Sequence, residues 1–148
     1  MNDRTDSPVA FFTSDHRRCD QLWADLEAEI ERGGPGVSDV RKQFDAAMRR
    51  HLSMEEEVFF PAFEQATGMH GGPTTVMRME HVQMRGVLDQ MAECDAEGDY
   101  EGVLDQGDTL NLLIQQHNAK EEGMLYPMAS RVLSARWPDI RAALARFE

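Results

Sequence analysis

The chain has 148 residues, 41% of them hydrophobic and 28% charged, which suits one folded domain with a single core. Its formal net charge of −12 disfavours a nucleic-acid or anionic membrane partner, and no apolar run approaches the roughly 20 residues that span a bilayer. Two cysteines make no disulfide framework, and the N-terminal residues lack the plan of a secretory signal, so we expect a cytoplasmic protein.

Glycine and proline interrupt the chain at GGPG (33–36), at GMHGGP (68–73) and, more weakly, at EGDYEG (97–102). Four long segments lie between these breaks, and the first begins at Ser7-Pro8, a helix cap followed by proline. In each segment, apolar residues and one histidine recur mostly at steps of three and four, which is the period of an α-helix. These residues form four stripes: Phe12, His16, Cys19, Trp23, Leu26 and Ile30; Val40, Phe44, Ala47, His51, Met54, Val58 and Ala62; Met77, His81, Met84, Leu88 and Met91; Val103, Leu110, Leu113, His117, Met124 and Met128.

No segment alternates with the period of a strand, so the sequence predicts an all-α protein. Four long helices with short connections favour an up-down-up-down four-helix bundle. We expect a single domain over residues 1–148, with residues 1–7 as a flexible N-terminal tail. Residues 136–148 are expected to form a short fifth helix that packs across one end of the bundle.

The sequence repeats itself at the level of helical hairpins. HLSMEEEVFFP (51–61) and HNAKEEGMLYP (117–127) share a histidine, a glutamate pair and a proline at an offset of 66 residues. Asp15-His16 and Glu80-His81 match at an offset of 65 residues. Each half therefore has a helix with one histidine, followed by a helix with a histidine and a glutamate. Two such hairpins can place these side chains around a pseudo-twofold axis.

Positions four apart share a helix face, so each of these histidines projects with the glutamate four residues on. His16 and His81 lie at distances from the chain breaks that place them at the same height along the bundle. The sequence therefore predicts one layer of six side chains: His16, His51, Glu55, His81, His117 and Glu121. We call these six residues the polar layer. Glu56 and Glu122 point to the side, so we expect them outside the layer, behind it or at the surface.

A buried polar group without a partner costs roughly 2–7 kcal/mol, and metal coordination removes that cost. Four imidazoles and two carboxylates are too many for one tetrahedral zinc and suit two ions of iron or manganese. A lone histidine on an apolar stripe is usually a hydrogen-bonded core residue, but four with two glutamates at one level favour a metal site. The exposed loop is the expected place for His70.

Other residues near the layer have plainer explanations. The methionines fit core packing, although Met77 and Met84 could also wall a small pocket for a gas molecule. Cys19 fits a small buried hydrophobic residue, with a thiol near the metal as the alternative. Pro61 and Pro127 predict helix kinks that shape the bundle outside the polar layer.

The pattern of His16, His51-x-x-x-Glu55, His81 and His117-x-x-x-Glu121 resembles the hemerythrin-like (HHE) cation-binding family over roughly residues 8–134. The resemblance implies a four-helix bundle with a non-haem di-iron centre bridged by oxo or hydroxo, in which manganese or zinc could substitute. His16 and His51 would then bind one iron, His81 and His117 the other, and Glu55 and Glu121 would bridge them.

Oxygen-carrying hemerythrins use five histidines, two of them four residues apart on the third helix, whereas Met77 and Arg85 flank His81 at that spacing here. The second bridging carboxylate is also Glu121 where the carriers have aspartate. The expected partner is therefore a diatomic gas or peroxide, in sensing or detoxification rather than carriage, and any enzymatic activity would be weak peroxide- or NO-directed redox chemistry. Metal storage, a structural metal site, and an interaction bundle without metal remain the alternatives. No catalytic residue and no protein partner is predicted.

Overall fold

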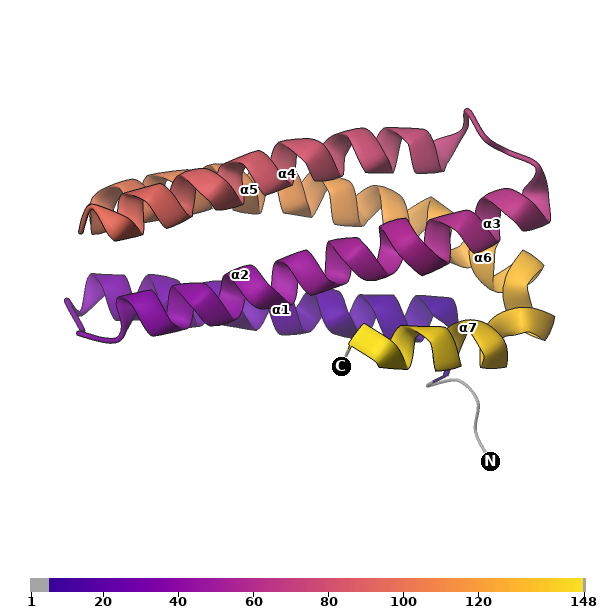
Figure 1. Ribbon diagram of the computed structural model, residues 1–148, viewed down its shortest axis with the longest axis horizontal. Helices are drawn as coiled ribbons and strands as arrows, with labels where there is room; N and C mark the ends of the chain where they lie inside the picture. Colours follow the sequence, from indigo (N-terminus) through magenta and orange to yellow (C-terminus); the bar gives the residue numbers. More distant parts are fainter. Residues whose placement is uncertain (1–5, 148) are drawn as a thin grey trace.

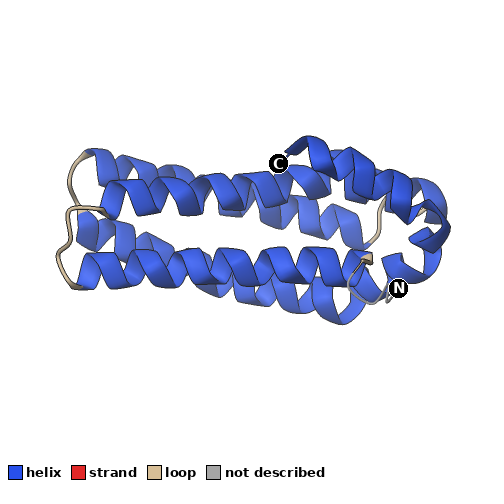
Figure 2. Cartoon of the chain, turned by 90° about the horizontal axis from the view of Figure 1, so that it is seen from below, coloured by secondary structure: helices blue, strands red, loops and turns tan. Residues whose placement is uncertain are grey.

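The computed structural model describes residues 6–147, and its regular elements in that range are all helices (Figure 2). The four rods of the bundle are α1 (Pro8–Glu31); α2 (Val37–Met54), which runs through a π turn (Glu55–Phe59) into α3 (Phe60–Thr67); α4 (Pro73–Ala96); and α5 (Tyr100–Lys120), which runs through a π turn (Glu121–Leu125) into α6 (Tyr126–Leu133). A 3-10 turn (Ser134–Arg136) leads to α7 (Trp137–Leu144), and a second (Ala145–Phe147) follows it.

The rods form two antiparallel hairpins that pack side by side. Helix α1 contacts α2, α4 contacts α5, and the square closes through contacts of α2 with α4 and of α1 with α5 (Figure 1). This arrangement confirms the all-α, up-down-up-down bundle expected from the four stripes. Within residues 6–147, no helix combines the length and the apolar character needed to cross a membrane.

The start of the bundle is set by local capping. The Ser7 side chain accepts a hydrogen bond from the Ala10 amide at 3.1 Å, and Pro8 occupies the first helical turn, as the sequence predicts. Most of the expected flexible tail, residues 1–5, lies outside the described residues. Asp6 accepts a hydrogen bond from the Trp137 indole at 2.9 Å, which ties the start of the chain to α7.

Pro61 and Pro127 each follow a π turn that begins at a glutamate of the polar layer. The amide of Phe60 donates to the carbonyl of Glu55, five residues back, and the amide of Tyr126 donates to that of Glu121 in the same way. Proline cannot donate to the carbonyl four residues back, and its ring crowds that carbonyl, so the wide turn before each proline relieves the conflict. The prolines themselves lie outside the polar layer, as expected, but the π turn before each of them begins at a glutamate of the layer.

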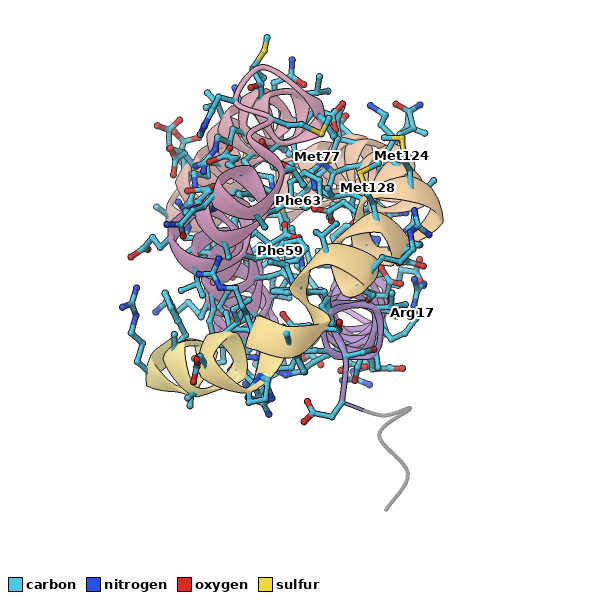
Figure 3. All side chains as sticks on the ribbon, turned by 90° about the vertical axis from the view of Figure 1, so that its right-hand side faces the viewer. Arg17, Phe59, Phe63, Met77, Met124 and Met128 are labelled. Atoms are coloured by element: carbon cyan, nitrogen blue, oxygen red, sulfur yellow. The ribbon has the colours of Figure 1, made fainter. Side chains whose placement is uncertain are left out.

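Each π turn inserts one extra residue and shifts the buried face that follows it. Met124, expected in the core, is 48% exposed, whereas Leu125 and Tyr126 are buried. In the other half Val58 is only partly buried, and Phe59 takes its place in the core. Figure 3 shows Phe59 directed into the bundle and Met124 at its outer surface.

The polar layer divides the core into two parts. The end that contains α3, α6 and α7 is rich in aromatic residues, including Phe12, Phe59, Phe60 and Phe63. The other end is built mainly from aliphatic and methionine side chains around Trp23 and Phe44. Helix α7 buries Trp137, Ile140 and Leu144 against the aromatic end and contacts the π turn at Glu55–Phe59.

Gly107 in α5 permits close packing against Trp23. A Cβ at this position would lie 2.1 Å from a ring carbon of the buried indole, whereas a Cβ at the exposed Gly86 of α4 would meet nothing within 4 Å. We expect Gly107→Ala to lower the free energy of unfolding by about 1–3 kcal/mol through overpacking. Gly86→Ala is the matched control, and it should raise that free energy by about 0.4–1 kcal/mol. Urea unfolding measures both, and equal effects would contradict the packing explanation.

Asp95 joins the two hairpins at the end away from α7. Its carboxylate accepts hydrogen bonds from the Ser38 hydroxyl and the Arg41 guanidinium, each at 2.6 Å. Burial raises the pKa of Asp95. The two hydrogen bonds and the Arg41 charge lower it by more than burial raises it, so the pKa lies below the ordinary value of 3.8. The ionised form therefore stabilises the fold.

We expect Asp95→Asn to reduce the free energy of unfolding by about 1.5–3 kcal/mol at neutral pH. The difference between the two proteins should persist above the unfolded-state pKa, near pH 4, and shrink as the pH falls through the lower folded-state pKa. Urea unfolding across this acidic range measures it. A difference that grows on acidification would contradict the prediction.

Candidate metal centre

Each rod contributes one histidine to the polar layer. His16 lies on α1, His51 on α2, His81 on α4 and His117 on α5, and all four are between 1% and 4% exposed. The imidazoles meet as two pairs: the ring centres of His16 and His51 lie 4.6 Å apart, and those of His81 and His117 lie 5.0 Å apart.

Both glutamates of the layer begin a π turn and are completely buried. Glu55 Oε1 lies 3.1 Å from His81 Nε2 and 3.5 Å from His51 Nε2, so this carboxylate faces both histidine pairs. Glu121 Oε1 likewise lies 3.1 Å from His16 Nε2 and 3.2 Å from His117 Nε2. The two carboxylates therefore stand between the two pairs.

The structure brings all six predicted residues together in two overlapping groups: His16, His51, Glu55 and Glu121; and Glu55, His81, His117 and Glu121. Within each group, one potential ligand atom from every residue lies within 4.8 Å of the others, and all members are buried. Each group could hold one metal ion, and the two glutamates are shared between them.

A second set of carboxylates holds the far side of each imidazole. The contacts to Nδ1 are Asp15 to His51 at 2.7 Å, Glu56 to His81 at 2.7 Å, Glu80 to His117 at 2.8 Å and Glu122 to His16 at 2.7 Å. Carboxylates accept hydrogen bonds, so Nδ1–H is the donor in each pair. We call these four residues the outer carboxylates. Glu56 and Glu122 lie behind the layer, as expected.

Each outer carboxylate is in turn paired with a basic side chain. The partners are Arg50 for Asp15, Arg85 for Glu56, Lys120 for Glu80 and Arg17 for Glu122. These cations hold the carboxylates in place beside the imidazoles. The proton on each Nδ1 leaves the Nε2 lone pair of a neutral imidazole facing the layer, which is the arrangement found around metal-binding histidines.

Several polar atoms of the layer lack a hydrogen-bond partner among residues 6–147. They are the Nε2 atoms of His51, His81 and His117, together with Glu55 Oε1 and Glu121 Oε2. Glu55 Oε1 lies close to the Nε2 atoms of His51 and His81 but without hydrogen-bond alignment. Buried polar atoms are normally satisfied, so five such atoms within the polar layer fit the donor set of bound cations.

The electrostatics of the layer favour positive charge. Burial lowers the pKa of His81, but the close carboxylate of Glu55 and the hydrogen-bonded carboxylate of Glu56 raise it more, to about 9. The pKa values of His51 and His117 are also raised despite burial, chiefly by the charge of Glu55 on His51 and by the close carboxylate of Glu121 on His117. Burial raises the pKa of Glu55, yet His51 and His81 hold it well below its ordinary value.

Tyr126 completes the layer, and sequence reasoning missed it. Its hydroxyl lies 2.6 Å from Glu55 Oε2, 2.8 Å from Glu121 Oε1 and 3.1 Å from His16 Nε2. Burial and the charges of the two glutamates raise the pKa of the phenol well above its ordinary value. No periodicity signal marks Tyr126, because only the extra residue of the π turn rotates it into the layer.

Asp15 and Glu80 are the other residues that sequence reasoning missed as part of the site. The repeat Asp15-His16 and Glu80-His81 was visible, but each acid supports the histidine of the following rod rather than its own neighbour. The sequence therefore showed an acidic residue before each of these histidines. Which histidine each acid contacts depends on how the rods pack, so the sequence could not identify it.

Four further residues can be compared with what the sequence predicted for them. Cys19 and Met84 line a small enclosed cavity of about 10 Å³ beside His16, large enough for about one water molecule. Burial raises the pKa of the Cys19 thiol to about 11, so it stays protonated. Met77 packs in the aromatic end, and the exposed His70 belongs to neither candidate group formed by the described residues.

Comparison with known proteins agrees with this geometry. A family model described as the hemerythrin HHE cation binding domain matches residues 7–129, which is well over half of the chain. No curated protein and no solved structure matches the chain.

Proposed function

This chain belongs to the hemerythrin HHE cation-binding family, and from that membership we propose that it is a non-haem di-iron protein that binds or reacts with a small oxidant. The observation that carries the proposal is the set of five buried, unsatisfied nitrogen and oxygen atoms within the polar layer, whose residues form the two candidate groups. His16 and His51 would hold one iron and His81 and His117 the other, with Glu55 and Glu121 shared between them.

Iron supports this role because it would supply the redox electrons and the coordination positions that O₂, peroxide or NO requires. Imidazole and carboxylate donors suit iron, and they also suit manganese or zinc as substitutes. The outer carboxylates fix the imidazole orientation, while the aromatic end and the methionine-rich end keep bulk water from the layer. The free thiols of Cys19 and Cys94 suit a reducing cytoplasm.

We favour sensing or detoxification over reversible oxygen carriage. Carriers place an additional histidine four residues from the histidine of the third helix. The two positions at that spacing from His81 hold Met77 and Arg85, and neither supplies an imidazole. Arg85 donates instead to Glu56 at 3.1 Å, which makes it part of the support for His81. The site therefore has fewer histidine donors than a carrier, which leaves room for a reactive molecule.

Metal analysis and visible spectroscopy of aerobically purified protein test the proposal. We expect about two irons per chain and an absorption band from a bridged ferric pair that bleaches with dithionite. Peroxide or NO added to the reduced protein should change the spectrum within the mixing time of a stopped-flow experiment. Colourless protein that holds one zinc would contradict the proposal.

The complete burial of Glu55 and Glu121 favours a second candidate, a structural or storage metal site without redox chemistry. In that case the bound metal would raise the melting temperature, because it binds the folded state only. Peroxide and NO would then leave the spectrum of the iron-loaded protein unchanged. The same stopped-flow measurement therefore separates the two functions.

A further inference from the structure

The two halves of the polar layer are nearly symmetric, and they differ at one aromatic residue. Tyr126 follows Glu121 by five residues, and Phe60 follows Glu55 by the same number. The Tyr126 ring lies 5.5 Å from the His16 ring at 31°, and the Phe60 ring lies 5.4 Å from the His81 ring at 31°. The pseudo-twofold repeat therefore places the two rings in equivalent positions, and only one of them carries a hydroxyl.

That hydroxyl is crowded by acceptors. Its single proton faces two carboxylate oxygens and the His16 Nε2 atom, all within 3.1 Å. His16 Nδ1 is engaged by Glu122, which leaves Nε2 as the ring nitrogen that faces the hydroxyl. One proton satisfies one of these three acceptors. The phenol oxygen, both carboxylates and the imidazole thus present converging lone pairs.

The separations also match those of donors around one ion. Two donor atoms that bind a metal at about 2.1 Å and at right angles lie about 3 Å apart. The phenol oxygen lies 2.6–3.1 Å from atoms of Glu55, Glu121 and His16, which are three of the four residues in one candidate group. The fourth member of that group is His51, which pairs with His16.

We propose that Tyr126 is a fifth protein ligand, bound as a phenolate to the metal ion held by His16 and His51. The proposal rests on the di-iron function proposed above. On binding, the oxygen–hydrogen bond of the phenol is replaced by an oxygen–metal bond, and the proton leaves to bulk solvent. A bound cation would stabilise the phenolate, as it stabilises the hydroxide form of metal-bound water.

The consequence is an asymmetric centre. The His16 and His51 ion has five protein donors, whereas the His81 and His117 ion has four, because Phe60 offers none. A hard anionic oxygen favours the ferric state of the first ion. Exogenous molecules therefore bind preferentially to the second ion, on the His81 side.

Iron-loaded protein provides the first test, with a readout that does not depend on activity. We expect a phenolate-to-iron charge-transfer band in the visible spectrum and tyrosinate ring modes in the resonance Raman spectrum. Tyr126→Phe should abolish both while the iron content stays at two per chain. Tyr100→Phe is the control and should leave both signals intact. Tyr100 is the other tyrosine of the chain, and it lies partly exposed at the start of α5.

The symmetry of the site offers a gain-of-signal test. Phe60→Tyr should add a second phenolate and intensify the band, and the exchange Tyr126→Phe with Phe60→Tyr should restore the band that Tyr126→Phe loses. Titration of metal-free protein with gallium(III) gives an independent readout. It should produce the near-ultraviolet difference band of tyrosinate in the wild type and not in Tyr126→Phe.

The possible failures are distinguishable. Two irons per chain without tyrosinate modes, or modes that survive Tyr126→Phe, would overturn the ligand assignment and leave the di-iron function standing. A chain that binds no metal would overturn both. A phenol that only donates a hydrogen bond to Glu55 predicts no gallium-induced tyrosinate band, so that result also counts against the proposal.

Discussion

The Glu55→Gln variant is expected to lose both metal ions, and with them the difference in melting temperature between metal-loaded and chelator-treated protein. Glu55 Oε1 lies close to Nε2 of His51 and of His81, so its carboxylate belongs to both candidate groups. A neutral amide keeps the shape of the side chain but removes the charge that the two proposed cations would share. Changing one histidine, as in His81→Ala, should instead lose one ion of the two.

The size of the effect follows from binding linkage. An ion present at about 1,000 times its dissociation constant stabilises the folded state by about 4 kcal/mol. For a domain of this length, that corresponds to roughly 8–16 °C in melting temperature. Wild-type protein should show at least this difference between its loaded and chelated forms, and Glu55→Gln should show almost none. Metal analysis and thermal unfolding followed by circular dichroism measure both quantities.

Glu57→Gln is the matched control, because Glu57 lies in the same π turn but its side chain is 57% exposed. It should keep two ions and the full thermal difference. Cooperative unfolding of chelated Glu55→Gln would show that the bundle still folds. Retention of two ions by Glu55→Gln would contradict the shared role of this carboxylate.

Loss of an outer carboxylate is expected to weaken metal binding without removing a ligand. Asp15→Asn should reduce affinity at the His51 site by about 10–100-fold, and Glu80→Gln should do the same at the His117 site. Asp15 accepts from His51 Nδ1 at 2.7 Å and is backed by Arg50 at 3.1 Å. The charge fixes the proton on Nδ1 and leaves the Nε2 lone pair for the metal.

Competition titration with a chelator of known affinity measures this loss, and nitrogen NMR of the histidines reports which ring nitrogen is protonated. Asp89→Asn is the control. It also removes an arginine–carboxylate pair, to Arg49 at 2.7 Å, but the Asp89 side chain is 67% exposed and has no histidine partner among the described residues. It should change neither affinity nor tautomer, and unchanged affinity in Asp15→Asn would show that the outer carboxylates have no part in binding.

The sequence by itself determined the elements of this protein and the level of its polar layer. Helical period, glycine and proline breaks and the 66-residue offset are all local or countable features, so they predict four rods and place six side chains at one height. The structure brings those six residues together as expected. Their role as metal ligands stays a prediction until the metal content of the protein is measured.

The tertiary structure alone decided which side chains support the layer. Neighbouring residues on a helix point about 100° apart, so the partner of Asp15 or Glu122 depends on which rod packs on that side. Likewise, the π turns before Pro61 and Pro127 advance the following residues, which buries Leu125 in place of Met124 and brings the Tyr126 hydroxyl to the two glutamates. A regular 3.6-residue period cannot anticipate that extra residue, because the following proline favours a wide turn without fixing which side chains the packing of the rods then buries.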